Sequence, residues 1–197
     1  MKDLQKMSPV ELKSCSILAS VYALRMLGMF LILPIFAIYA TNLDSNPTSL
    51  QIGLALGIYG LTQAIFQIPF GMSSDYFGRK KVIYFGLLLF IIGSLIAGYS
   101  TSIEGIILGR SIQGSGAISA VLTALLADIT REEQRTKAMA IIGASIGLTF
   151  ALSLVLSPWL NDMIGVDGIF ILMAILSFIA FLLVYFFIKE PEIRKEK

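Results

Sequence analysis

Six long apolar runs, separated by short polar segments, dominate the chain. They cover residues 16–40, 50–73, 82–100, 104–127, 138–160 and 168–188. About 20 apolar residues in a helix cross the hydrocarbon core of a bilayer, and every run reaches or approaches that length. The connecting segments are rich in charges or in turn-forming residues. The pattern therefore predicts an all-α integral membrane protein with six transmembrane helices.

The composition supports the same class of protein. Hydrophobic residues make up 56% of the 197 residues and charged residues only 14%, whereas soluble domains are about half apolar and about a quarter charged. The polar N-terminal segment, 1–15, leads into an apolar run that is too long for a signal peptide. We therefore expect the first run to stay in the membrane, with the lipid bilayer around all six helices.

Positive charge lies on one side of the predicted membrane. All but two of the 15 Lys and Arg residues fall in four segments that six spans place on the same side. These segments are 1–15, 79–81, 131–137 and 189–197. Because cytoplasmic loops carry an excess of Lys and Arg, we expect a plasma (inner) membrane protein with both termini in the cytoplasm.

Two arginines are exceptions because they lie inside predicted spans, Arg25 in the first and Arg110 in the fourth. An arginine at mid-membrane costs about 2.5–3.5 kcal/mol on insertion scales. Neither has an acidic residue within one helical turn. We expect both, with the polar Gln113, to face the bundle interior or a water-filled cavity. The alternative is that the long arginine side chains reach the membrane surface.

Small residues four positions apart are typical of close helix contacts in membranes. The second span contains Gly53 and Gly57, and the fifth contains Gly143 and Gly147. We expect these four glycines to let neighbouring helices approach each other closely.

The segment GMSSDYFGRKK, residues 71–81, separates the second span from the third. Asp75 and Arg79 are four apart, a spacing at which side chains pair on a helix, and Gly78 permits a tight reversal with a positive φ angle. An Asp at the C-terminal end of a helix is unfavourable beside the negative end of the helix dipole unless a cation partners it. The alternative is an ordinary positive-inside loop, which explains the basic residues but not the Asp or the glycine.

Two motifs resemble those of the major facilitator superfamily. GMSSDYFGRKKV, residues 71–82, is similar to the G-x-x-x-D-x-x-G-R-K motif between that family's second and third spans. LGRSIQGSGA, residues 108–117, is similar to the R-x-x-Q-G-x-G-A pattern of its fourth span. Segments along nearly the whole chain also resemble the YajR-type drug/proton antiporters within the superfamily. The resembling segments include 25–30, 57–71, 106–117 and 135–145.

The resemblance implies roles for individual residues. It implies a cytoplasmic gate that docks the two halves of the transporter and favours the outward-facing state. The gate residues are Gly71, Asp75, Gly78, Arg79, Lys80 and Asp128. It also links Arg110 to proton coupling in a central cavity, and we assign Arg25, Gln113 and Gly114 to the same cavity.

A complete transporter of this family has twelve spans in two halves, with its site between them. The six spans match one half, a 3+3 repeat. We therefore interpret 1–197 as an N-terminal six-helix half, in which 1–15 is a cytoplasmic N-terminus and 189–197 begins a cytoplasmic linker. A second six-helix half, either a missing C-terminal half or another subunit, is the expected partner.

The fifth span departs from the resemblance. Antiporters of the family often carry G-x-x-x-G-P-x-x-G-G there, whereas SLVLSPWLND, residues 153–162, keeps only Pro158. We assign Pro158 to helix packing. The departure weakens an antiporter assignment relative to symport or uniport.

The predicted function is secondary active transport, namely proton-coupled efflux of small, drug-like molecules by alternating access. No acidic residue lies deep in a span, so the titrating group is expected in the second half or in the gate. The alternative is a truncated or split half-transporter that is inactive alone or acts as an interaction subunit. The sequence has no His, a single Cys and no phosphate-binding loop, so we expect no enzyme activity, metal, cofactor or nucleic-acid partner.

Overall fold

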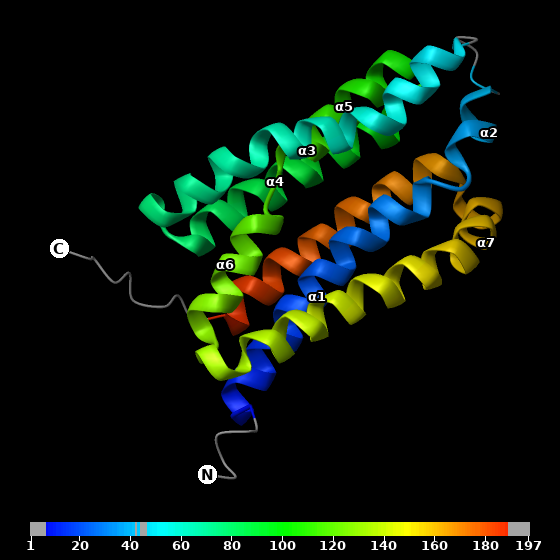
Figure 1. The fold of residues 1–197 in the computed structure, drawn as a ribbon. Helices are drawn as coiled ribbons and strands as arrows, with labels where there is room; N and C mark the ends of the chain where they lie inside the picture. The colour runs from blue at the N-terminus through cyan, green and yellow to red at the C-terminus, as the bar shows by residue number, and fades with distance from the viewer. Residues whose placement is uncertain (1–6, 42, 44–46, 189–197) are drawn as a thin grey trace.

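The computed structural model describes residues 7–41, 43 and 47–188, and these residues form helices and short turns. Seven helices lie within the described ranges: α1 (Pro9–Ile32), α2 (Phe36–Thr41), α3 (Ser49–Phe77), α4 (Arg79–Tyr99), α5 (Ile103–Ser115), α6 (Ser119–Ile129) and α7 (Glu132–Phe187). The start of α1 and the end of α7 lie at the same end of the bundle (Figure 1). The predicted linker, 189–197, and residues 1–6 of the predicted cytoplasmic N-terminus lie outside the described residues.

The seven helices make six membrane crossings. Two of the crossings each consist of two helices, and two others are joined in the single long helix α7. The first crossing is α1 followed by α2, and the fourth is α5 followed by α6. Helix α7 has 56 residues, which would be about 84 Å if straight, far more than a bilayer core of about 30 Å. The non-helical Gly165, with φ 68° and ψ 175°, divides it into two antiparallel arms, 132–164 and 166–187 (Figure 1). The predicted all-α membrane fold is therefore confirmed.

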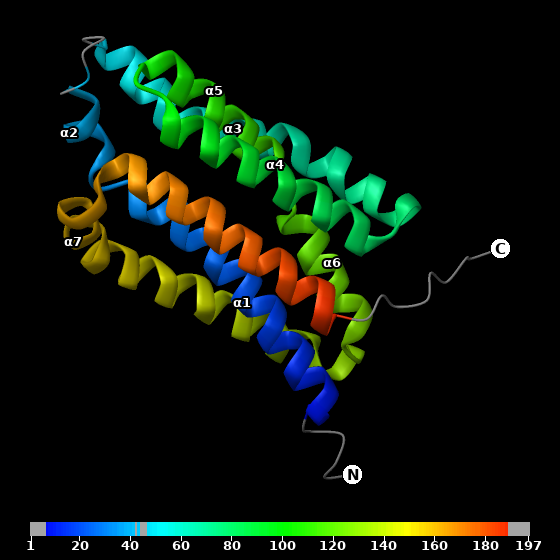
Figure 2. The same ribbon diagram turned by 180° about the vertical axis from the view of Figure 1, so that it is seen from behind.

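The helices form two groups that α6 connects. Helices α3, α4 and α5 lie together, and α1 lies between the two arms of α7; both views show α6 running from the first group to the second (Figure 1, Figure 2). Two apolar cores fill the bundle. One, around Leu18 and Leu122, lies towards the start of α1 and the end of α7, an end that we call the inner end after the predicted orientation. The other, around Phe36 and Phe170, lies towards the opposite, outer end. On α1, the buried Arg25 lies between the residues that belong to the first core and those that belong to the second.

Two crossings are interrupted, the first after the 24 residues of α1 and the fourth near its middle, between α5 and α6. Pro34 lies in the turn between α1 and α2, where its missing N–H and its ring are incompatible with a continuing helix. The second break, at Gly116, Ala117 and Ile118, separates α5 from α6. A break at membrane depth needs other hydrogen-bond partners for its free backbone groups, and these partners define the interior site described below.

The closest helix contacts are made by glycines other than the four predicted. A Cβ atom on Gly93 of α4 would lie 2.5 Å from the backbone nitrogen of Gln113 and 2.5 Å from the carbonyl oxygen of Gly109 on α5. The two helices therefore touch backbone to backbone, which only small residues allow.

Gly53, Gly57, Gly143 and Gly147, which we expect to allow close helix contacts, do not contact another described helix of this chain. A Cβ atom on any of them would meet no atom within 4 Å among the described residues. They lie on faces of α3 and of the first arm of α7 that no described helix covers. Pro158 is likewise exposed on that arm, so it does not act as a buried packing residue within this bundle.

Replacing Gly93 with Ala is expected to force α4 and α5 apart. Overpacking of this kind costs on the order of 1–3 kcal/mol, which corresponds to a fall of about 3–10 °C in the melting temperature of a chain of this size. Thermal unfolding of the detergent-purified protein measures the shift. Gly57→Ala is the matched control, because its added methyl group meets nothing, and equal melting temperatures for the two variants would contradict the backbone contact.

Candidate gating and transport site

Three helix ends meet at Arg79, the first residue of α4. Its Nη1 atom lies 2.5 Å from Asp75 Oδ1 at the end of α3, and its Nε atom donates to Asp128 Oδ2 at the end of α6, at 3.0 Å. The Nη1 atom also donates to the Ser74 hydroxyl at 2.6 Å. The structure thus brings together Asp75 and Arg79, as their spacing predicted, and Asp128, which the resemblance placed with them.

Gly78 makes this arrangement possible. It is the single residue between α3 and α4, and its φ of 98° and ψ of 143° lie in a region that residues with a Cβ atom rarely adopt. The positive φ predicted from the sequence is confirmed. Gly71, one turn before Asp75, faces Ala120 of α6 at 3.9 Å from a notional Cβ atom, so this glycine lies at an α3–α6 contact.

The cluster is open to its surroundings on one side. The side chain of Arg79 is 18% exposed, whereas those of Asp75 and Asp128 are 65% and 40% exposed. Exposed ion pairs contribute about 0–1 kcal/mol to stability. The cluster is therefore a weak tie between helix ends rather than a major source of stability, and Asp75 retains an accessible carboxylate edge.

Lys80, which the resemblance assigns to the gate, lies outside this cluster. Its Nζ atom donates to the carbonyl oxygen of Ile188 at 2.6 Å and lies 5.7 Å from the centre of the Tyr84 ring. The next residue along from Arg79 on a helix points about 100° away, which explains the difference. Lys80 instead holds the end of the second arm of α7 against α4.

A second ion pair at the same end of the bundle was missed from the sequence. Glu11 of α1 accepts three hydrogen bonds from Arg131, at 3.0 Å each from the backbone nitrogen, Nε and Nη2. The Ser8 side chain and Glu11 also form a capping box at the start of α1. That cap was the only available signal in the sequence, and it accounts for Glu11 without any partner.

The Glu11–Arg131 pair stays ionised at physiological pH. Glu11 precedes the first apolar run, and hydrogen bonds from the Arg131 side chain and backbone lower its pKa to about 2. The same pair raises the pKa of Arg131. Because the folded pKa of Glu11 is below its ordinary value of 4.5, its contribution to stability is present above about pH 4.5 and is lost only as the pH falls towards 2.

Arg25 is fully buried and binds the break in the fourth crossing. Its Nη2 atom donates to the Gly116 carbonyl oxygen at 2.8 Å, and its Nη1 atom donates to the Ser119 hydroxyl at 2.9 Å. The guanidinium also lies 5.7 Å from the centre of the Phe90 ring. Arg25 faces the bundle interior, as predicted, and caps the end of α5, where the helix dipole favours a cation.

Arg110 is equally buried and ties α5 to α3. Its Nε atom donates to the Ala55 carbonyl oxygen at 2.7 Å, and its guanidinium lies 5.3 Å from the centre of the Tyr59 ring. Tyr59 packs edge-to-face on Phe90, with ring centres 6.3 Å apart. The two arginines are therefore linked through two aromatic rings, each cation resting on one ring.

Gln113 and Gly114 fill the contacts around these arginines. Gln113 Nε2 donates to the Ser94 hydroxyl at 2.8 Å and contacts Met173 Sδ at 3.5 Å, so it joins α5 to α4 and α7. A Cβ atom on Gly114 would lie 2.0 Å from Thr62 Oγ1 and 2.2 Å from the Tyr59 carbonyl oxygen. Gly114 is thus a contact between α5 and α3, not a residue that lines a cavity within this chain.

The polar interior retains unused hydrogen-bonding capacity. Among the described residues, Arg25 Nε, Gln113 Oε1 and Ser177 Oγ are buried and have no hydrogen-bond partner. In the same part of the chain, no group of three or more His, Cys, Asp or Glu residues could hold a metal ion. The interior is therefore cationic and polar, with its positive charge balanced by carbonyl groups rather than by carboxylates.

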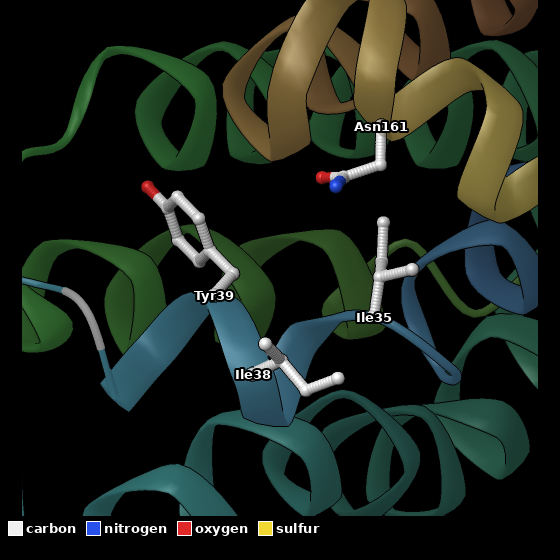
Figure 3. Close-up of a pocket in the computed structure, with 4 residues that line it drawn as sticks. All are labelled: Ile35, Ile38, Tyr39 and Asn161. Atoms are coloured by element: carbon white, nitrogen blue, oxygen red, sulfur yellow. The ribbon is translucent and has the colours of Figure 1, made fainter.

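A small pocket lies near the reversal of α7, at the end of the bundle opposite the start of α1. It has a volume of about 210 Å³ and is lined by Ile35, Ile38, Tyr39 and Asn161 (Figure 3). Tyr39 and the two isoleucines come from α2 and the turn before it, whereas Asn161 extends from the first arm of α7 (Figure 3). The Tyr39 hydroxyl donates to Asp167 Oδ1 at 2.5 Å, which ties α2 to the reversal of α7.

Comparisons with known proteins agree with this architecture. The sequence matches the model of the Major Facilitator Superfamily over residues 18–197. The inner membrane transport protein YajR of Escherichia coli (strain K12) is 54% identical over 172 residues, which are 87% of this chain and 38% of that protein. The class B tetracycline resistance protein of Escherichia coli is 30% identical over 168 residues, which are 84% of this chain and 42% of that protein.

The fold has counterparts among solved structures. The crystal structure of a bacterial homologue of the human lysosomal transporter Spinster, in an inward-facing and unoccupied conformation, matches with a TM-score of 0.79 at 15% identity. The match covers 94% of this chain and 44% of that chain. The chain thus spans less than half the length of these three proteins. It is an integral membrane protein of the Major Facilitator Superfamily, a family of transporters and not of enzymes, and it has the fold of one six-helix half.

Proposed function

We propose that this chain forms one half of a secondary active transporter that exports small, drug-like molecules in exchange for protons by alternating access. The observation that carries the proposal is the ion cluster in which Arg79 is held between Asp75 and Asp128. The cluster joins three helix ends by weak, exposed pairs. Such pairs suit a contact that must hold one arrangement of helices and release it in another.

A second six-helix half is the proposed partner. Support comes from the uncovered faces that carry Gly53 and Gly57 on α3, and Gly143 and Gly147 on the first arm of α7. Small residues at such spacing let membrane helices of separate units pack closely. The accessible edge of Asp75 lies at the inner end of the same helix, α3, where a helix of the second half would complete the gate.

Proton coupling is proposed for the polar interior. Arg25 and Arg110 are fully buried, and no carboxylate of the described residues lies within 4 Å of either guanidinium. A buried cation favours the ionised form of a nearby carboxylate. A carboxylate that the second half places beside Arg110 is therefore ionised while the two are in contact, and it takes up a proton when the halves move apart.

Efflux and the plasma (inner) membrane are proposed from the relatives. The 54% identical relative is an inner membrane transport protein, and the 30% identical relative is a tetracycline resistance protein. Cytoplasmic placement of the gate rests on the distribution of Lys and Arg. An alternative function is an interaction subunit that is inactive alone, which the same uncovered glycine faces also favour.

Transport in membrane vesicles tests proton coupling. With a second six-helix half present, we expect an imposed pH gradient to raise the efflux of a fluorescent cationic dye severalfold. The chain alone is expected to give no flux. Equal flux with and without the gradient would overturn proton coupling, and absence of flux with every second half tried would favour the interaction subunit.

Asp75→Asn is expected to weaken the gate because the carboxylate loses its charge with little change in shape. An exposed pair of this type contributes about 1 kcal/mol, so the balance between outward-facing and inward-facing states shifts about fivefold. Labelling of an introduced cysteine in the proposed cavity reports that balance. Asp162→Asn is the control, since it makes the same change just before the reversal of α7 at Gly165, away from the cluster. An unchanged balance in Asp75→Asn would show that the segment is an ordinary loop.

A further inference from the structure

We propose that the Glu11–Arg131 ion pair is a positioning device for the gate, because it fixes the turn between α6 and α7 and so holds Asp128 in reach of Arg79. This inference deepens the proposed gating function. The pair joins α1 to the α6–α7 turn, and neither of its residues contacts Arg79 directly. Glu11 and Arg131 are therefore positioning residues rather than members of the gate itself.

The pair is geometrically specific at both ends. Glu11 Oε1 accepts from the backbone nitrogen and Nε of Arg131, and Oε2 accepts from Nη2. The carboxylate thus holds the backbone and the side chain of Arg131 at once, in the two-pronged geometry that only arginine offers. The Glu11 side chain is only 8% exposed, although that of Arg131 is 42% exposed, so the carboxylate has little room to leave this contact.

Glu11 is itself fixed before it binds Arg131. Its Oε2 atom accepts from the backbone nitrogen of Ser8 at 2.7 Å, and its own backbone nitrogen donates to the Ser8 hydroxyl at 3.2 Å. The carboxylate therefore belongs to the first turn of α1, a helix that packs along both arms of α7 (Figure 1). A partner that is ordered in advance loses less conformational entropy when it binds.

The turn that receives this contact is too short to move independently of Asp128. Helix α6 ends at Ile129, Thr130 is its C-cap, and Arg131 is the N-cap of α7. Asp128 lies three residues before Arg131, and the Arg131 carbonyl oxygen accepts from the backbone nitrogen of Gln134 at 2.9 Å. Holding the Arg131 backbone therefore sets where α6 ends and which way Asp128 points.

The consequence is that α1, the end of α6 and the start of α7 move as one body at the inner end. The Arg79–Asp128 bond then joins that body to α4. If the end of α6 were free to unwind, the exposed carboxylate of Asp128 would sample many positions. The entropy cost of ordering it would then cancel the small free energy of its pair with Arg79. The anchor allows a weak pair to act as a defined contact.

A distance measurement tests the positioning role without requiring transport. Spin labels on Lys81→Cys and Ala127→Cys, with Cys15→Ala removing the single native cysteine, report the separation of the inner ends of α4 and α6. We expect Glu11→Gln to broaden the distance distribution as much as Asp128→Asn does. Gln at this position still completes the capping box, so the change isolates the ion pair.

Two further variants keep the test decisive if Glu11→Gln does not fold. Arg131→Lys retains the backbone bond and the charge but not the two-pronged contact, and we expect intermediate broadening. The matched control is Glu132→Gln, which removes an exposed ion pair with Arg135 of 3.5 Å in the same turn. We expect no broadening there. A narrow distribution in Glu11→Gln or Arg131→Lys, or equal broadening in Glu132→Gln, would overturn the proposal.

A transport assay separates this proposal from the proposed function. If the gate operates, Asp128→Asn is expected to shift the balance between outward-facing and inward-facing states about fivefold in the parent protein. In a protein that already carries Glu11→Gln, the same substitution is expected to shift it less than about twofold. Exchanging the charges, with Glu11→Arg and Arg131→Glu together, is expected to restore part of the effect. Additive effects of Asp128→Asn and Glu11→Gln would overturn the positioning role. If Glu11→Gln broadens the distance distribution but transport does not change, the ion pair still positions α6, and the proposed gating function is rejected.

Discussion

Arg25 donates hydrogen bonds at the break between α5 and α6, where the helical backbone hydrogen bonds of the fourth crossing are interrupted. The carbonyl oxygen of Gly116 accepts from Arg25 Nη2 at 2.8 Å and from the backbone nitrogen of Ile118 at 2.9 Å. In a bilayer, an unsatisfied backbone group costs several kcal/mol, so both donors stabilise the break. Beyond the break, α6 runs from the α3–α4–α5 group towards α1 and α7 (Figure 1). Arg25 binds Ser119 at the start of α6, and Asp128 near its end pairs with Arg79. The interior charge and the ion cluster therefore lie at the two ends of the same short helix.

The spacing of neighbouring residues in the sequence was enough to predict part of this site. Asp75 and Arg79 lie within one helical turn and Gly78 requires a positive φ, so their arrangement follows from short-range geometry. The break at Gly116 and its partner, 91 residues away, leave no local periodic signal. The Glu11–Arg131 pair joins residues 120 apart and was hidden because a capping box already accounted for Glu11. Contacts across the bundle depend on how the helices are aligned along one another, which apolar runs do not specify.

The glycines illustrate a second limit of sequence patterns. Gly53 and Gly57 have the spacing of a packing motif and touch nothing, whereas Gly93 and Gly109 pack backbone to backbone. The motif identifies a face that admits close approach, but not which helix approaches. In a protein built from similar halves, that helix can belong to another unit. Uncovered glycine faces on α3 and α7 are therefore consistent with the proposed interface between halves.

The end of the bundle that carries the start of α1 holds two ion contacts that differ in the number of hydrogen bonds and in how their acids are held. Glu11 is buried, is held by a cap and accepts three hydrogen bonds from Arg131, whose own side chain is 42% exposed. Asp75 and Asp128 are exposed, and each pairs with Arg79 through the side chain alone. In the proposed gate, a contact that opens in every transport cycle has to be weak, because each opening must overcome its free energy. A weak contact is specific only when its partners are already in place, which requires a more firmly held contact beside it. Under the proposal, the hydrogen bonds between Glu11 and Arg131 hold the end of α6 in place, and the pair between Arg79 and Asp128 stays reversible.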